Sequence, residues 1–259
     1  MKPIRIVITQ FRRRSTTEEN FLEAMTLLDG FKGIPAFSEN WLLNKPLNID
    51  DYYYYIDKLG NKLKENILGG IQYVYEKDVI KSVGLAFIDN KVIKICEKIN
   101  ASKAVYERGF ISKGKYIYPI SVDDWKIGCI GCVDIFYPEI SRIHTINGAN
   151  ILYNPASISE DSIKLWHSVL SARASENMSF SIGVNNTKTV YPDGRITGGQ
   201  SIVFNPHGDM LVSLGSQDFA LPIDLEPDLL DYVENRWAFK DDLNQIYSKY
   251  YIDLMNDLK

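Results

Sequence analysis

Alternating strand-like and helix-like segments predict an α/β protein built from layers of sheet and helix. Short apolar runs typical of buried strands alternate with helical patterns through the first two thirds of the 259-residue chain. Capping and turn residues mark the boundaries, and no linker rich in Pro, Gly or Ser divides the sequence. We therefore expect one domain over residues 1–259, in which residues 220–259 form a C-terminal extension that packs on it or on a partner subunit.

The N-terminal half is expected to begin with a strand at residues 4–11 and a helix that Gly30 ends. Ser15 and Glu18 have the spacing of a capping box at the start of that helix. A second helix is expected from Asn48 to about residue 66, because Asn48 and the acidic residues after it are typical of a helix N-terminus. Further strands are expected at residues 33–37, 69–75, 82–88 and 91–95.

The second half follows the same alternation. After a long polar loop at residues 109–124, a short buried strand is expected at residues 127–132. Pro138 suits the first position of a helix, which Gly148 closes. Two more helices are expected at residues 161–174 and 228–258, and four more strands at residues 150–153, 180–184, 201–204 and 210–213.

Composition and charge exclude several classes of partner. Apolar residues make up 45% of the chain and the net charge is −4, so no basic surface for nucleic acid or an anionic membrane is indicated. Three cysteines are not a disulfide framework and favour a reducing compartment. The N-terminus lacks the apolar core of a signal peptide, and no apolar run reaches the roughly 18 residues of a membrane span. We expect a cytoplasmic protein.

The segment around Cys129 and Cys132 carries the clearest chemical signal. A buried strand ends at a cysteine and leads through a turn into a helix, at the sheet edge where open α/β sheets bind ligands. On spacing alone, a buried core cysteine is the more common explanation and the one we favour. A metal site or a redox motif is a weaker interpretation, because Cys96 and three scattered histidines are the only other soft ligands.

A cysteine hydrolase also needs a base, and no histidine here has a local signature of that role. A carboxylate can replace histidine if burial raises its pKa. Glu39 is suitable because it directly follows an apolar strand, although a single glutamate is more commonly an exposed loop residue. The residues alone therefore leave the choice between an enzyme site and core packing open.

An ordered set of short motifs covers nearly the whole chain. Four of them contain Glu39, Lys98, Glu107 and Cys132. The later ones are Gly148-Ala149, Asn154-Pro155-Ala156, Trp166, residues 172–177, Asn185, Gly199-x-Ser201, Pro206-x-Gly208, Arg236, Phe239 and Tyr247. Together they resemble the nitrilase superfamily of carbon–nitrogen hydrolases, in its amidase-like branch. Departures from the family pattern are Ser38 for a common Pro, Asn100 for a frequent His, and Asp241-Asp242 for Asp-Arg-Arg.

The resemblance implies a four-layer α-β-β-α sandwich with two mixed sheets and a Glu-Lys-Cys site. Cys132 would be the nucleophile, Glu39 the general base, and Glu107 the residue that positions water. Lys98 and the backbone N–H of Val133 would stabilise the oxyanion. Substrate contacts are expected from Tyr137 and Trp41. The resemblance requires neither a metal nor an organic cofactor, and it implies a homodimer that pairs through helices at residues 139–147 and 161–174.

The residues after the nucleophile favour a small amide or N-carbamoyl compound as the substrate. Val133-Asp134 is nearer to the amidase pattern than to the Trp-Glu of nitrile hydrolases. Phe136 stands where many small-dicarboxylate amidases carry Arg, so Arg108 or Lys113 is the expected replacement partner for an acidic substrate. Alternatives that use the same fold are a catalytically idle scaffold for protein interaction, a nitrile hydrolase, and an acyltransferase.

Overall fold

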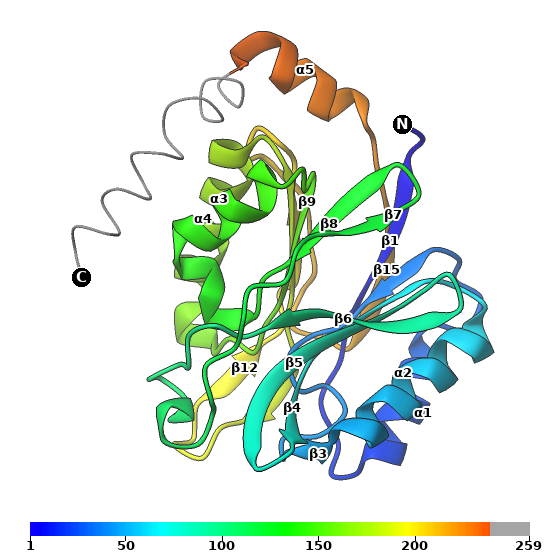
Figure 1. The fold of residues 1–259 in the computed structure, drawn as a ribbon, viewed down its shortest axis with the longest axis vertical. Coiled ribbons are helices and arrows are strands. Elements are labelled where there is room, and N and C mark those ends of the chain that lie inside the picture. Colours follow the sequence, from blue (N-terminus) through cyan, green and yellow to red (C-terminus); the bar gives the residue numbers. More distant parts are fainter. Residues whose placement is uncertain (239–259) are drawn as a thin grey trace.

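The structure is a computed structural model that describes residues 1–238, and its strands form two large mixed sheets (Figure 1). The first sheet pairs β1 with β2 in parallel and with β15 antiparallel. Its strands, in spatial order, are β15 (Phe219–Leu225), β1 (Ile4–Gln10), β2 (Ile34–Ala36), β4 (Ile67–Glu76), β5 (Val79–Ile88) and β6 (Lys91–Glu97), with β3 (Leu47–Asn48) beside β4.

The second sheet is also mixed, since β9 is parallel to β8 and β10 whereas β13 is antiparallel to β10. Its strands, in spatial order, are β14 (Met210–Ser213), β13 (Ile202–Phe204), β10 (Phe180–Val184), β9 (Ile151–Pro155), β8 (Trp125–Cys129) and β7 (Ile120–Val122). A small hairpin of β11 (Thr187–Val190) and β12 (Ile196–Gly198) stands apart from both sheets.

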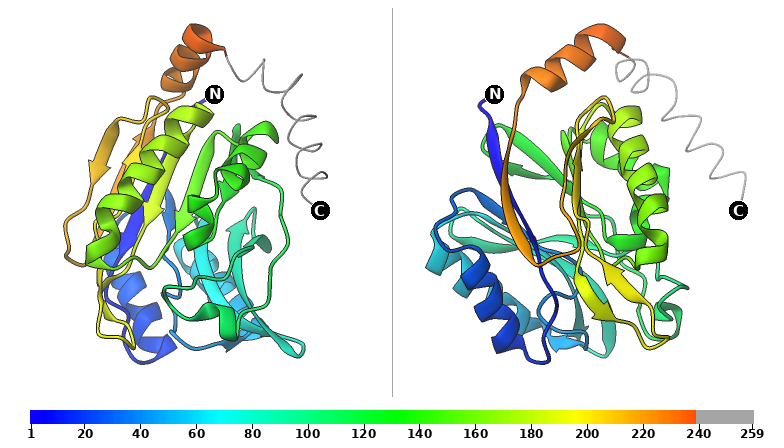
Figure 2. Two further views of the ribbon diagram at one scale, coloured as in Figure 1. Left: turned by 90° about the vertical axis from the view of Figure 1, so that its left-hand side faces the viewer. Right: turned by 180° about the vertical axis from the view of Figure 1, so that it is seen from behind.

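Helices cover the outer face of each sheet. Helices α1 (Thr17–Leu27) and α2 (Ile49–Leu63) pack on the first sheet, and α3 (Pro138–Ile146) and α4 (Ile163–Asn177) pack on the second (Figures 1 and 2). Helix α5 (Asp228–Trp237) follows β15 at one end of the molecule. The order of layers is helix, sheet, sheet, helix, and the four-layer sandwich expected from the sequence is confirmed.

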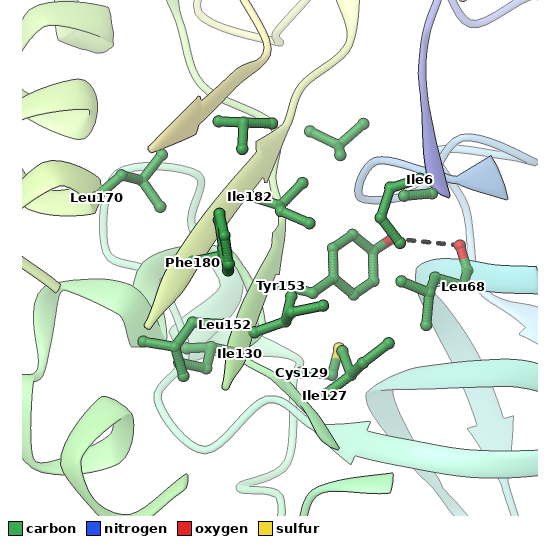
Figure 3. Close-up of a cluster of buried hydrophobic side chains, with 14 of the residues drawn as sticks. Ile6, Leu68, Ile127, Cys129, Ile130, Leu152, Tyr153, Leu170, Phe180 and Ile182 are labelled. Atoms are coloured by element: carbon green, nitrogen blue, oxygen red, sulfur yellow. Dashed lines mark hydrogen bonds between the residues drawn. The ribbon is translucent and has the colours of Figure 1, made fainter. Parts of the chain in front are cut away.

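Strand β1 shows how the sequence builds this stack. Successive side chains of a strand point to opposite faces. Ile6 and Ile8 pack between the two sheets, whereas Val7 packs under the helices of the first sheet. Figure 3 shows the space between the sheets, where Tyr153 of β9 reaches across and donates a hydrogen bond to the Leu68 carbonyl of β4 at 3.3 Å. Both faces of β1 are buried, which explains its nearly continuous apolar sequence.

Several predicted boundaries shift in the structure. The capping box is formed by Thr16 and Glu19, one position later than expected, because Thr16 has the extended backbone that a cap requires. Strand β8 ends at Cys129, and Cys132 lies in the short helix η2 (Cys132–Phe136) instead of the strand. Strands β7, β11, β12 and β15 were not predicted, and β7 interrupts the expected loop.

The helix expected at residues 228–258 ends at Trp237, because Ala238 has a left-handed backbone with a φ of 49°; residues 239–258 lie outside the described residues. The expected motif residues Phe239, Tyr247 and Asp241-Asp242 lie outside the described residues. Within residues 1–238, no helix is both long enough and apolar enough to cross a membrane. Residues 220–225 of the expected C-terminal extension belong to β15, an edge strand of the first sheet that pairs along all of β1.

Candidate active site

The buried Lys98 side chain pairs with two buried glutamates, Glu39 and Glu107. The Lys98 Nζ lies 2.9 Å from Glu39 Oε1 and 2.6 Å from Glu107 Oε1. All three side chains are at most 2% exposed. The fold therefore brings Glu39 to Lys98 and Glu107 from 59 positions before the lysine, and each charged group depends on the others for its solvation.

The two glutamates have different surroundings. Besides Lys98, Glu107 accepts a hydrogen bond from the Tyr73 hydroxyl at 2.6 Å and another from the Ser102 backbone N–H at 2.6 Å. Glu39 is bonded to Lys98 and to the thiol of Cys132. Glu107 is thus held by three donors, whereas Glu39 faces the sulfur and is the carboxylate placed to exchange a proton with it.

Glu39 is positioned at the point where the two sheets meet. Its segment continues from β2, and its backbone N–H donates to the Ala156 carbonyl after β9 at 3.2 Å. Asn186 donates from its side-chain amide to the Glu39 carbonyl at 2.8 Å and accepts from the Ser38 hydroxyl at 2.8 Å. Ser38, which replaces the proline common in the resembling family, therefore contributes a hydrogen bond that holds this segment in place.

Lys98 follows the end of β6, and Asp134 anchors the backbone after it. The Asp134 carboxylate accepts hydrogen bonds from the Ile99 N–H at 2.6 Å and from the Asn100 N–H at 2.9 Å. Asp134 belongs to η2, so the same side chain ties the segment of Lys98 to the segment of Cys132. A Cβ atom on Gly131 would lie 3.3 Å from the Lys98 Cβ, which shows how closely the two segments approach.

Cys132 occupies a backbone conformation that side chains rarely adopt. Its φ is 44°, in the left-handed region, at the start of η2. The side-chain amide of Asn154 donates to the Cys132 carbonyl at 3.1 Å, and the Trp166 indole N–H donates to Asn154 at 2.8 Å. Arg173 of α4 donates to the Ile135 carbonyl at 2.9 Å. The motif residues on β9 and α4 therefore support the turn that carries Cys132.

Burial and neighbouring charges shift the pKa of each group. Burial raises the pKa of Glu39, an effect that Lys98 opposes and Glu107 adds to. Burial also raises the pKa of the Cys132 thiol well above its ordinary value, with Glu39 adding to the effect. Burial alone would lower the pKa of Lys98, but the nearby Cys132, Glu39 and Glu107 raise it well above its ordinary value. Without substrate, the site thus contains a neutral Cys132 thiol, a charged Lys98 and a Glu39 carboxyl with a raised pKa.

The other two cysteines lie in the core between the sheets. The sulfurs of Cys96 and Cys129 are 3.1 Å apart, one on β6 and the other on β8. Burial, followed by the hydrogen bond with Cys96, raises the pKa of Cys129 well above its ordinary value. Their role is core packing, as the resemblance implies. Within the described residues, no group of three or more His, Cys, Asp or Glu side chains is arranged to hold a metal ion.

Trp41, an expected substrate contact, lies in the core of the first sheet, and its role in substrate binding stays a prediction. Its side chain is fully buried, stacks on Phe37 with ring centroids 4.2 Å apart, and donates from its indole nitrogen to the Gly69 carbonyl at 2.7 Å. The apolar strand before Trp41 carries it into the core beneath α1 and α2. Tyr137 is 38% exposed where η2 joins α3, and Val133 is partly exposed as the second residue of η2, so their expected roles stay predictions.

Some functional side chains had no signal in the sequence. Tyr73 is one tyrosine among several in an alternating strand, and only the pairing of β4 places its hydroxyl on Glu107. Asn186 stands next to the motif residue Asn185 without any pattern of its own. Asp134 was noted for its bearing on the substrate, whereas its carboxylate joins two backbone segments.

The four-layer sandwich and the buried group of Cys132, Glu39, Lys98 and Glu107 are typical of an α/β enzyme. The family follows from the similarity of this sequence to known proteins. The sequence model of the carbon-nitrogen hydrolase family matches residues 56–219. A hydrolase encoded in the agr operon of Staphylococcus aureus is 29% identical over 182 residues, which cover 69% of each chain. A 2-oxoglutaramate amidase of Bacillus subtilis is 29% identical over 152 residues, covering 59% of this chain and 58% of the relative.

Solved structures agree with the fold. A protein of the carbon–nitrogen hydrolase superfamily from Xanthomonas campestris, with an arsenic adduct in its active site, superposes with a TM-score of 0.86. The match covers 93% of this chain and 97% of the other at 18% sequence identity. This chain belongs to the carbon-nitrogen hydrolase family, as its motifs indicate, and it is a hydrolase.

Proposed function

We propose that the protein hydrolyses a small amide or N-carbamoyl compound through a thioester on Cys132. One observation carries this proposal: the Lys98 ammonium bonds both Glu39 and Glu107 beside the Cys132 thiol. A nucleophile, a proton acceptor and a fixed positive charge are the groups that acyl transfer from an amide requires. The amidase among the relatives supports the same reaction class.

In the first half of the reaction, the Cys132 sulfur attacks the carbonyl carbon while its proton passes to Glu39. The developing oxyanion is stabilised by Lys98 and by the Val133 N–H, each such donor contributing roughly 3 kcal/mol to the barrier reduction. The C–N bond then breaks, and Glu39 returns the proton to the leaving nitrogen. The products of this half are a thioester and free ammonia or amine.

In the second half, water attacks the thioester carbon and loses a proton to Glu39. The C–S bond breaks, the carboxylic acid is released, and the proton on Glu39 returns to the sulfur. Glu107 holds Lys98 in place and orients the water. The raised pKa of Glu39 matches this cycle, because a carboxyl that is easily protonated can accept and return the same proton.

Ammonia release from a panel of small amides, N-carbamoyl compounds and nitriles tests the proposal. We expect turnover of amides or N-carbamoyl compounds, with little from nitriles, and intact-protein mass spectra of rapidly quenched samples should show acylated enzyme. A nitrile preference would contradict the proposed substrate class. Complete inactivity of the folded protein, with no alkylation of Cys132 faster than of the other cysteines, would instead support the idle-scaffold alternative.

We also propose that the protein is a cytoplasmic homodimer that pairs through α3 and α4. These helices expose Ile143, Ile146 and Leu165, which are 43%, 41% and 59% exposed in the single chain. Apolar residues on neighbouring helices at one outer face are typical of an interface. Ile140, on the same helix α3, is 8% exposed and packs in the core.

Sedimentation at micromolar concentration is expected to give twice the 29.6 kDa mass of the chain. Leu165→Glu should shift the protein towards the monomer, because a charge would be buried at the interface. Leu22→Glu is a matched control, since Leu22 is 62% exposed on α1 at the opposite outer face. A monomer for the unmodified protein would contradict this assembly.

A further inference from the structure

Three consecutive arginines, Arg12, Arg13 and Arg14, follow strand β1, and only the middle one is buried. Arg12 and Arg14 are exposed, whereas Arg13 is only 9% exposed. Arg14 lies 3.4 Å from Glu23 and 3.7 Å from Asp218 in salt bridges. Arg13 takes part in no salt bridge within the described part of the chain. A buried guanidinium without an anion is costly, so its position calls for an explanation.

The topology of the first sheet places Arg13 at the site. Strands β1 and β2 are neighbours and parallel, so their carboxyl ends meet at the same edge of the sheet. Arg13 follows β1 and Glu39 follows β2. The Arg13 Nη1 donates to the backbone carbonyl of Asn40, the residue after Glu39, at 2.9 Å. The arginine is therefore fixed by the same segment that carries the proposed general base.

Arg13 shares electrostatic neighbours with the groups around Cys132. Tyr191 is anchored through its hydroxyl on Ser157, and its pKa is raised by burial and by Cys132 and Glu39, while Arg13 acts to lower it. Burial lowers the pKa of Arg13, and Tyr191, Tyr73 and Glu39 act against that shift. Glu39 thus acts on the pKa of both Arg13 and the Cys132 thiol, and within the described residues Arg13 pairs with no carboxylate.

The charges of the site leave the Arg13 guanidinium without an anionic partner. Glu39 and Glu107 already share the one ammonium of Lys98, so neither is available to neutralise Arg13. A guanidinium has five N–H donors in a planar fork that matches a carboxylate, and the Asn40 carbonyl uses one of them. The other cations expected to bind an acidic substrate, Arg108 and Lys113, are exposed on the loop.

We propose that Arg13 binds a carboxylate at the far end of the substrate, so that the preferred substrate is the monoamide of a short dicarboxylic acid. This inference rests on the proposed amide hydrolysis and adds its substrate class. The bound carboxylate would neutralise the buried guanidinium, and the Cys132 sulfur would then face the amide carbon at the other end of the same molecule. An uncharged amide would leave the buried Arg13 guanidinium without an anionic partner.

The test compares succinamate with butanamide, which has the same carbon chain but a methyl group in place of the carboxylate. The unmodified protein should prefer succinamate. Arg13→Gln should lower kcat/KM for succinamate by roughly 100- to 1,000-fold, the usual effect of losing a buried charged partner, and for butanamide by less than about 3-fold. Arg12→Gln, a change at the exposed neighbour, should leave both values unchanged.

Arg13→Lys keeps a positive charge and a donor for the Asn40 carbonyl but loses the planar fork. It should lower kcat/KM for succinamate by about 10-fold without affecting butanamide, and it decides the question if Arg13→Gln does not fold. Equal losses for the two substrates in the folded variants would mean a structural role and overturn the proposal. A preference of the unmodified protein for butanamide would overturn it as well.

Binding measurements distinguish a failure of the carboxylate site at Arg13 from a failure of the proposed amide hydrolysis. Calorimetric titration of succinamate into Cys132→Ala protein should give a dissociation constant that rises at least about 30-fold when Arg13→Gln is added. If the unmodified protein hydrolyses neither amide but this selective binding is seen, the proposed reaction fails and the carboxylate site stands. If the Cys132→Ala protein binds succinamate no better than butanamide, the carboxylate site fails.

Discussion

Replacing Cys132 by alanine is expected to abolish amide hydrolysis, with kcat/KM falling by at least about 10⁴-fold. The sulfur forms the covalent bond to the substrate in the proposed reaction, and no neighbouring group can replace it. Initial rates of ammonia release with succinamate, measured over several hours, would check this. The fold should be retained, because Asn154 holds the Cys132 backbone carbonyl and not its side chain.

Cys129→Ala is the matched control for that experiment. Cys129 is buried between the sheets beside Cys96, with a thiol pKa raised well above the ordinary value. Removing its sulfur should lower stability by about 1 kcal/mol through the loss of one packed atom and leave most of the activity. Full inactivation by Cys129→Ala in a folded protein, with activity retained in Cys132→Ala, would show that the nucleophile has been assigned to the wrong sulfur.

Glu39→Gln is expected to reduce turnover nearly as much as the loss of the nucleophile, by about 10³- to 10⁴-fold. The amide has almost the shape of the carboxyl group but cannot accept the thiol proton. Combining Glu39→Gln with Cys132→Ala should cause almost no further loss of turnover, because the two residues act as one unit. Rates for the two single variants and the double variant would reveal this lack of additivity.

The pH dependence of the unmodified enzyme gives an independent measure of Glu39. The carboxyl must be ionised to accept the thiol proton, and its pKa is raised above the ordinary 4.5 by burial. Activity should therefore fall as the pH drops through this raised pKa, at a higher pH than an ordinary glutamate would cause. The residual activity of Glu39→Gln should lack this acidic limb. An acidic limb at or below the ordinary value would contradict the role of Glu39.

Stability distinguishes a catalytic defect from a folding defect. A carboxyl with a raised pKa in the folded state stabilises the fold below its unfolded pKa, and this contribution is lost as the pH rises through the folded pKa. Ionised Glu39 is therefore unfavourable for folding at neutral pH. Glu39→Gln should show a thermal midpoint at pH 7 that is no lower than that of the unmodified protein, although its activity is lost.

Local sequence patterns determined most of the secondary structure. Helix α2 begins after Asn48 as its cap predicts, and Pro138 opens α3, because these signals act within one turn of helix. The edge strand β15 was not predicted. It is held by pairing with β1 at the other end of the chain, over a separation that no local pattern records. The same reason applies to the Trp41 indole, whose hydrogen bond to the Gly69 carbonyl of β4 joins residues 28 positions apart.

The residue types of the candidate site were predictable from the sequence, and its geometry was not. The ordered motifs predicted Glu39, Lys98, Glu107 and Cys132 as the candidate site, since each stands in a recognisable local context. Strand order and the approach of the two sheets place the Lys98 ammonium between both carboxylates. They also bring the buried Arg13 to the carbonyl of Asn40, the residue after Glu39. Periodicity along a chain reports which face of an element is buried. Which elements those faces meet is decided by long-range packing, and this packing brings the separate segments to one reaction centre.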